Sequence, residues 1–241
     1  MIKHNNPCGV AISDSLSVSY EKAFNSDQVS AFGGIIGCNT EVDAATAELM
    51  SSLFIEAIIA PSFSDDAFQI LAQKSSLRLV ELPNFFEQDH SFQIRYVQGG
   101  ILAQTPDQVV MNEDAIQVVT NRAPEAHESR DLKFAFAICK HVKSNAIVLV
   151  KNGQTIGVGA GQMSRVESVE IALKKASNNV NGAVCASDAF FPFKDSIEHL
   201  AAHGITAIVQ PGGSKRDQES IDACNENDMT MVFSGIRHFK H

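Results

Sequence analysis

The first residues of the chain bring several reactive side chains together. Lys3 and His4 are followed by two asparagines, a proline and Cys8. A lysine can stabilise developing negative charge, and a histidine can move protons near neutral pH. Cys8 could act as a nucleophile, because a cysteine paired with a histidine is a known catalytic device. On spacing alone, a solvated N-terminal tail is the alternative interpretation.

A glycine-rich segment at residues 157–161 has the spacing G-x-G-x-G. A dinucleotide fingerprint needs G-x-G-x-x-G within a βαβ unit, and the strand expected before this segment belongs to a hairpin instead. We therefore predict a tight backbone bend, either beside a ligand or purely structural. Ser164 and Arg165 lie just beyond it. A hydroxyl and a forked guanidinium suit an anionic ligand.

An aromatic segment at residues 187–195 places three phenylalanines around one proline. It could form a wall for a flat heterocycle, with Asp188 or Asp195 making polar contacts. A core wedge at a strand-to-helix corner is the alternative. Arg237 belongs to a basic C-terminal segment, which is either solvated or able to clamp a phosphate.

Metal chemistry is not indicated, and we predict no metal site. Zinc deaminases need H-x-E and P-C-x-x-C, but Asn5 and Asn6 follow His4, and no second cysteine follows Cys8 at that spacing. The chain also lacks H-E-x-x-H. Its five cysteines are an odd number without a C-x-x-C pair, so we predict reduced, mostly buried thiols.

The composition narrows the class of partner. The 241 residues include 19 Lys and Arg against 28 Asp and Glu, a formal net charge of −9, with 44% hydrophobic residues. This acidity argues against a nucleic-acid partner. The apolar runs are far shorter than the ~20 residues that a membrane helix needs, and the first residues are unlike a signal peptide. We therefore expect no membrane partner and a cytoplasmic protein.

The elements that must position these residues form two α/β halves. In the first half, predicted strands and helices alternate in the order 34–37 (strand), 42–53 (helix), 55–60 (strand), 65–73 (helix) and 77–82 (strand). In the second half, the corresponding elements are 193–203 (helix), 205–210 (strand), 216–225 (helix) and 229–233 (strand). Alternation of this kind predicts parallel strands. The similar order of the two halves suggests an internal duplication.

One segment predicts antiparallel pairing. Asn152 and Gly153 join the apolar runs 145–151 and 155–158, and Asn-Gly between such runs is a strong hairpin signal. The sheet should therefore be mixed. We predict an irregular connection over residues 88–124 and a helix over 131–142. A boundary within 122–125 divides the chain into units 1–122 and 123–241.

Eight motifs occur in order along the chain: KHNNPCG, SAFGG, IIAP, KSNA, GAGQMSR, SDAFFPF, QPGGS and RHFKH. Together they resemble the AICAR transformylase domain of the bifunctional AICAR transformylase/IMP cyclohydrolase family. The resemblance implies two tandem cytidine-deaminase-like, three-layer α/β units with mixed sheets and no zinc. It also implies transfer of formyl from 10-formyltetrahydrofolate to the 5-amino group of AICAR, which gives FAICAR and tetrahydrofolate in IMP biosynthesis.

The resemblance further implies roles for three catalytic residues. His4 would accept a proton from the attacking amine, and Lys3 would stabilise the oxyanion or help protonate the departing N10. Asn145 would position the formyl group and the histidine. Cys8 would then be structural.

The remaining family contacts are implied in the same way. AICAR would be bound by Gly33, Glu56, Asn145 and Arg165, and by Phe190 and Arg237 from the partner subunit of a homodimer with shared active sites. The folate co-substrate would be bound by Val166, Asp195, Ser214 and Lys215.

The family's transformylase domain begins upstream of its Lys-His motif. We therefore expect the first unit to be incomplete at its N-terminus, the cyclohydrolase domain to be absent, and Lys3 and His4 to lie on a frayed end. Two alternatives to an active formyltransferase remain. One is a nucleotide- or folate-binding module without turnover, and the other is an inert dimerisation fragment.

Overall fold

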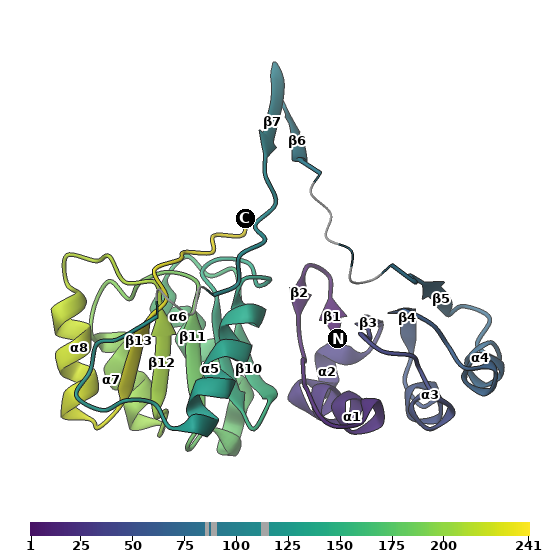
Figure 1. Ribbon diagram of the computed structural model, residues 1–241, viewed down its shortest axis with the longest axis horizontal. Coiled ribbons are helices and arrows are strands. Elements are labelled where there is room, and N and C mark those ends of the chain that lie inside the picture. Colours follow the sequence, from purple (N-terminus) through teal and green to yellow (C-terminus); the bar gives the residue numbers. More distant parts are fainter. Residues whose placement is uncertain (85–86, 88–90, 112–115) are drawn as a thin grey trace.

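The chain forms two sheets with helices packed on them, and a two-stranded ribbon projects from the connection between the sheets (Figure 1). The computed structural model describes residues 1–84, 87, 91–111 and 116–241. Parallel and antiparallel pairs occur in both sheets, so the predicted α/β class with mixed sheets is confirmed. None of the described helices combines the length and apolar character that crossing a bilayer requires.

The first sheet has the strand order β2-β1-β3-β4-β5. Its strands are β1 (Ile2–Lys3), β2 (Asn6–Pro7), β3 (Gly34–Gly37), β4 (Ile55–Ala60) and β5 (Arg78–Glu81). Its helices are α1 (Leu16–Ser26), α2 (Gln28–Ala31), α3 (Ala44–Ser51) and α4 (Asp65–Leu71). Each of the four begins after a serine or aspartate whose side chain accepts a backbone N–H of the first turn. Such caps fix where the helices start.

The second sheet has the order β10-β9-β11-β12-β13-β8. Its strands are β8 (Gln117–Val118), β9 (Ile147–Lys151), β10 (Gln154–Gly159), β11 (Val184–Ser187), β12 (Ala207–Gln210) and β13 (Thr230–Phe233). Its helical elements are α5 (Ala126–Cys139), α6 (Arg165–Ala176), the short η2 (Ser177–Asn179), α7 (Asp195–Ala202) and α8 (Asp217–Glu226). Because β8 pairs with β13, residues before 122 contribute to this sheet. The division of the chain at residue 122 stays a prediction.

The two sheets repeat one topology. In each, a hairpin precedes three parallel strands, and the order β2-β1-β3-β4-β5 recurs as β10-β9-β11-β12-β13. The hairpin turns also match, since His4 in the first and Asn152 in the second both have φ of 53°. Gly153, with φ of 69°, completes the predicted Asn-Gly turn. The predicted hairpin and the internal repeat are thus confirmed at the level of topology.

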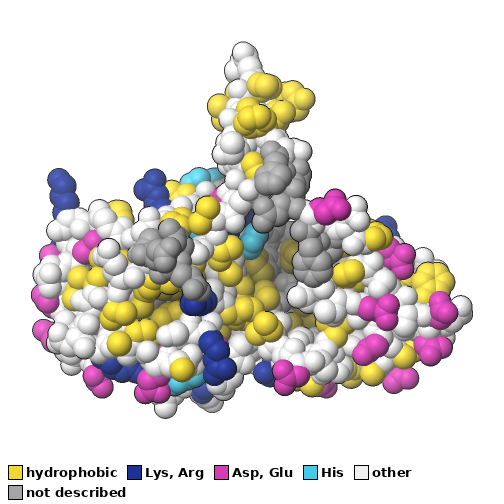
Figure 2. Space-filling model, viewed as in Figure 1, with side chains coloured by type: hydrophobic (Ala, Val, Ile, Leu, Met, Phe, Trp, Pro, Cys, Tyr) yellow, Lys and Arg dark blue, Asp and Glu magenta, His cyan; other side chains and the backbone are white. Residues whose placement is uncertain are grey.

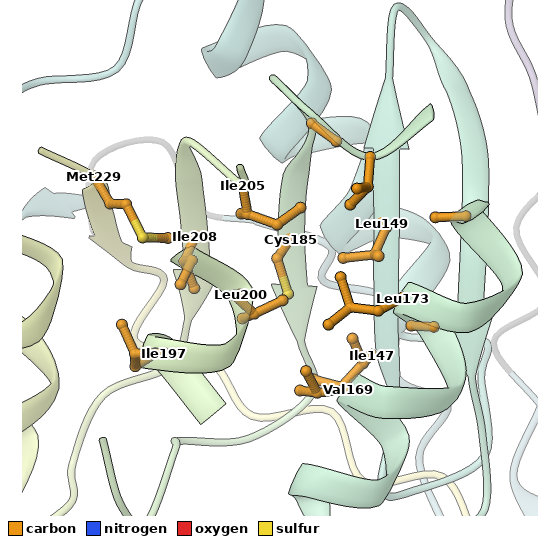
Figure 3. Close-up of a cluster of buried hydrophobic side chains, with 14 of the residues drawn as sticks. Ile147, Leu149, Val169, Leu173, Cys185, Ile197, Leu200, Ile205, Ile208 and Met229 are labelled. Carbon is orange, nitrogen blue, oxygen red and sulfur yellow. The ribbon is translucent and has the colours of Figure 1, made fainter. Parts of the chain in front are cut away.

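The second sheet is buried on both faces. Ile147 and Leu149 of β9 join the apolar cluster formed with α6 and α7 (Figure 3). The intervening Val148 and Val150 join a second cluster, with α5. Alternate residues of one strand therefore meet different helices, which explains why β9 is apolar throughout. The first sheet differs, because Ile35 on β3 and Val80 on β5 are 37% and 43% exposed.

Several predicted boundaries need correction. Helix α5 begins at Ala126 rather than 131, because Glu125 and Glu128 form a capping box that makes its first turn polar. The segment predicted as irregular contains a ribbon, β6 (Gln93–Val97) with β7 (Gly100–Gln104), as well as β8. Residues 88–90 and 112–115 of that segment lie outside the described residues.

The expectation of a frayed end at Lys3 and His4 is also wrong. β1 lies between β2 and β3, with Ile2 paired to both Pro7 and Ile35. The backbone amide of Cys8 donates to the carbonyl of Met1 at 3.0 Å. Strand pairing therefore holds β1 on both sides at Ile2, and Lys3 pairs with Asn6 of β2.

The glycines of β10 explain how closely α6 approaches the sheet. A Cβ atom on Gly157 would lie 2.1 Å from the carbonyl oxygen of Ala172, and one on Gly159 would lie 1.9 Å from that of Ser168. Both glycines lie within the strand, so the predicted bend is wrong for them. Gly161, with φ of 70°, does turn the chain.

Gly159→Ala is expected to lower the free energy of unfolding by about 1–3 kcal/mol, because the added methyl group meets rigid backbone. Gly37→Ala, in β3, is the matched control, since its Cβ would meet nothing within 4 Å. It should leave stability within about 0.5 kcal/mol of wild type. Urea denaturation measures the free energy of unfolding of both variants. Equal denaturation midpoints for the two variants would contradict this account of α6 packing.

Candidate functional site

A cavity of about 420 Å³ in the second unit contains half of the predicted site residues. We call it the main pocket. The predicted residues that line it are Asn145, Arg165, Val166, Phe190, Asp195 and Arg237. They come from distant segments of the sequence, which extend from Asn145 to Arg237. The fold therefore gathers them into one place.

Two helices and the segment after a strand meet at the main pocket. Helix α6 begins at Arg165, helix α7 begins at Asp195, and the chain leaving β11 supplies Phe190. The N-terminal turn of a helix carries partial positive charge and free N–H groups. In α6, Ser164 and Glu167 form a capping box that fixes this turn. The arrangement favours an anionic group near Arg165.

Arg165 is the centre of a buried polar network. Its Nη1 donates to Asp188 Oδ1 at 2.5 Å and to Ser187 Oγ at 2.8 Å, and its Nη2 donates to Asn145 Oδ1 at 2.8 Å. Ser144 Oγ donates to the other oxygen of Asp188. Arg165 is 7% exposed and Asp188 is fully buried. The network fixes the guanidinium at the wall of the main pocket.

The same network fixes Asn145. Its Nδ2 donates to the carbonyl oxygens of Gln162 at 2.9 Å and Met163 at 3.2 Å, while its Oδ1 accepts from Arg165. The amide orientation is therefore determined by the protein. Asp188, which the sequence offered as a ligand contact, is instead committed to Arg165 and Ser144.

The aromatic segment divides between the core and the main pocket. Phe191 is fully buried in the core, whereas Phe190 and Phe193 line the main pocket. Arg216 stacks on the Phe193 ring at 4.7 Å, and Arg237 stacks on Phe239 at 4.5 Å. The predicted core wedge is confirmed for Phe191, whereas the predicted aromatic wall stays a prediction for Phe190 and Phe193. The exposed rings offer a surface for a flat heterocycle.

Lys3 and His4 are not among the residues that line the main pocket. Lys3 Nζ donates to the carbonyl oxygens of Phe32 at 2.7 Å and Gly33 at 3.1 Å, and Lys3 lines a separate cavity of about 200 Å³. His4 is exposed in the β1–β2 turn. Asn6 links this hairpin to the Asn145 segment, since its Oδ1 accepts from the backbone N–H of Lys143 at 2.9 Å. Gly33, with φ of 64°, is brought against Lys3.

The other predicted residues do not line the main pocket. Glu56, on β4, forms an exposed ion pair with Arg78 at 3.2 Å. Ser214 and the exposed Lys215 precede α8, where the backbone N–H of Ser214 donates to Asp217 at 3.1 Å. Arg216, which follows them, reaches the main pocket through its stacking on Phe193.

The cysteines are free, and four of the five are buried. Burial raises the pKa of the Cys38 thiol to about 11 and that of Cys224 to about 12. Desolvation also raises the pKa of Cys8, which disfavours the reactive thiolate. The predicted reduced, mostly buried thiols are confirmed. Among the described residues, no group of three or more His, Cys, Asp or Glu side chains is placed to hold a metal ion.

Comparison with known proteins gives one consistent family. Residues 1–175 match the model of the AICARFT/IMPCHase bienzyme. The chain is 51% identical over 240 residues to the bifunctional purine biosynthesis protein PurH of Oceanobacillus iheyensis and 50% identical over 244 residues to that of Aquifex aeolicus. Each match covers all of this chain and 47% of the relative. The chain thus spans about half the length of these curated relatives.

Proposed function

Because this chain belongs to the AICARFT/IMPCHase bienzyme family, we propose that it carries the formyl-transfer site of a purine biosynthesis enzyme. Its substrates would be AICAR and 10-formyltetrahydrofolate, and its products FAICAR and tetrahydrofolate, without a required metal. We place this reaction in the cytoplasm. We also propose that the two units of repeated topology are cytidine-deaminase-like.

The observation that carries this proposal is the composition of the main pocket. Asn145, Arg165, Phe190 and Arg237 were each predicted as AICAR contacts, the last two from a partner subunit, and all four line this one cavity of a single chain. Two arginines and the first turn of α6 suit a phosphate. The exposed phenylalanines suit an imidazole ring. Val166 and Asp195, predicted for the folate, line the same cavity.

The proposed chemistry uses one proton acceptor and one cation. The AICAR amine attacks the formyl carbon, a new C–N bond forms, and His4 accepts the proton that the amine releases. Lys3 stabilises the oxyanion of the tetrahedral intermediate. The bond to N10 then breaks while N10 takes up the proton that His4 holds, with help from Lys3, and tetrahydrofolate leaves. Asn145 holds the formyl group in line with the amine.

We further propose a homodimer with shared sites. In one chain, Lys3 lines a different cavity from Asn145, and His4 is in an exposed turn. A second copy could bring its β1–β2 hairpin to the main pocket. A shared site would reconcile these separate positions with one reaction. Dimer formation is also supported by the apolar side chains that the ribbon exposes (Figure 2).

A binding module without turnover is the second candidate. The absence of His4 from the main-pocket lining favours it, because a single chain would then bind AICAR and still lack its proton acceptor. Titration and turnover distinguish the two candidates. Stoichiometric AICAR binding without any product supports the module.

Phe190→Ala is expected to weaken AICAR binding by up to about tenfold, since it removes the ring that would stack on the imidazole. Phe68→Ala on α4, where the ring is 51% exposed, is the matched control and should bind as wild type does. Isothermal titration calorimetry measures the AICAR affinity of the wild type and of both variants. Undetectable AICAR binding to wild type, or equal affinities for the two variants, would refute the assignment of the main pocket.

A further inference from the structure

Three parallel strands of the second sheet lead to the main pocket from their carboxyl ends. The segment after β11 supplies Phe190, and the segment after β13 supplies Arg237. The segment after β12 carries Arg216, which stacks on Phe193 of the pocket wall. β12 lies between β11 and β13 (Figure 1). Its last residue, Gln210, is therefore placed where all three segments begin.

The side chain of Gln210 is bonded to the aromatic segment. Gln210 is completely buried, and its Oε1 accepts a hydrogen bond from the backbone N–H of Phe191 at 2.8 Å. That N–H belongs to the peptide group that joins Phe190 to Phe191. Because a buried N–H without a partner costs free energy, this bond holds the peptide group in one orientation.

The other polar atoms of Gln210 are also bonded. Its Nε2 donates to Met231 Sδ at 3.1 Å, a weak acceptor. Its backbone carbonyl oxygen accepts from the backbone N–H of Ser234 at 2.8 Å, at the start of the segment that leads to Arg237. One buried residue thus contacts both segments that supply Phe190 and Arg237.

The peptide group on the other side of Phe190 has a separate anchor. Ser187 Oγ donates to the carbonyl oxygen of Ala189 at 2.7 Å and accepts from Arg165 at 2.8 Å. The Phe190 ring is only partly buried, whereas its neighbours Ala189 and Phe191 are buried. The direction of this ring therefore depends on the backbone that carries it. Ser187 and Gln210 hold that backbone from its two sides.

We infer that Gln210 is a positioning residue, which holds the Phe190 ring at the wall of the main pocket. Gln210 is not among the residues that line this cavity, so it acts through Phe190. The inference rests on the proposed function for the ligand, AICAR, whose imidazole would stack on the ring. A side chain with a structural role alone would change stability without changing the order of the Phe190 side chain.

A fluorescent reporter at position 190 tests the inference without a ligand. The sequence contains no tryptophan, so Phe190→Trp places a single indole at the pocket wall. In this parent protein, Gln210→Met removes the acceptor and keeps an unbranched side chain of similar length. Acrylamide quenching of the reporter should then rise about twofold or more, and its anisotropy should fall, because the side chain gains motion on the nanosecond timescale.

Two further variants of this parent are the controls. Met231→Leu removes the sulfur contact of Gln210 but leaves the bond to Phe191, and Gln210→Glu keeps an acceptor oxygen at the end of the side chain. Both should leave the reporter as it is in the parent. Urea denaturation checks the folding of each variant. If Gln210→Met does not fold, Gln210→Asn replaces it, because its oxygen is one carbon short of the Phe191 N–H. An unchanged reporter after loss of the acceptor, or equal loosening in either control, overturns the inference.

AICAR affinity then connects the position of the ring to the ligand. With Phe190 present, Gln210→Met should weaken AICAR several-fold, by no more than the roughly tenfold expected for Phe190→Ala. In the Phe190→Ala background, the same change should alter the affinity by less than about twofold. Equal losses in both backgrounds would show that Gln210 acts by another route, and would overturn the inference. If the reporter loosens as expected while wild type binds no AICAR, the proposed function fails and the positioning of the ring by Gln210 stands.

Discussion

Asp188→Ala is expected to lower the free energy of unfolding by about 3–5 kcal/mol, because it leaves the buried Arg165 guanidinium without its carboxylate. The pair is almost fully removed from water, with side-chain exposures of 6% for Arg165 and 0% for Asp188. Ser144 also loses its acceptor. Urea denaturation at neutral pH measures the change.

The exposed ion pair between Arg78 and Glu56 supplies the control. Its side chains are 70% and 48% exposed, so Glu56→Ala should cost at most about 1 kcal/mol. Asp188→Asn keeps the shape of the side chain and one acceptor oxygen. Its loss of unfolding free energy should therefore lie between those of Asp188→Ala and Glu56→Ala. An Asp188→Ala protein as stable as the Glu56→Ala protein would show that the network does not hold Arg165.

His4→Asn is expected to lower the turnover number for formyl transfer by about 10²–10⁴-fold, the usual cost of losing a general base. Asparagine is chosen because it tolerates the left-handed conformation of this turn, with φ of 53°. The repeat supports the choice, since Asn152 occupies the same position of the second hairpin with the same φ. The fold should therefore be retained.

Asn5→Ala, in the same turn, is the matched control and should keep most of the activity. AICAR affinity of His4→Asn, measured by titration, should stay within a few-fold of wild type, because Phe190 and the arginines would still bind the nucleotide. A variant with full turnover would remove His4 from the proposed mechanism. A variant that loses binding and turnover together would make His4 a binding residue instead.

The parts of the fold that the sequence predicted have strong local signals. The strands β3 and β4 are apolar runs, and the β9–β10 hairpin carries Asn152 and Gly153 at its turn. The ribbon was missed because its apolar side chains are largely exposed, so no buried face marks its period. Tyr96, for example, is 89% exposed. Helix α5 was predicted too short because its first turn is polar and capped by glutamates.

The site was predicted residue by residue rather than as an arrangement. Residue types and motifs pointed to Asn145 and Arg165, but not to the hydrogen bond between them. Asp188 was taken as a possible ligand contact, because a sequence does not show that a carboxylate is buried against an arginine 23 positions away. The roles of Gly157 and Gly159 in helix packing were likewise invisible, since the close approach of α6 is a tertiary feature.

The most direct test of the central proposal is formyl transfer by this chain itself. Tetrahydrofolate formation is followed with 10-formyltetrahydrofolate present, with and without AICAR, for wild type and His4→Asn. We expect formation that requires AICAR and falls by about 10²–10⁴-fold in the variant. No AICAR-dependent tetrahydrofolate from the wild-type chain would contradict the proposal that this chain carries the formyl-transfer site.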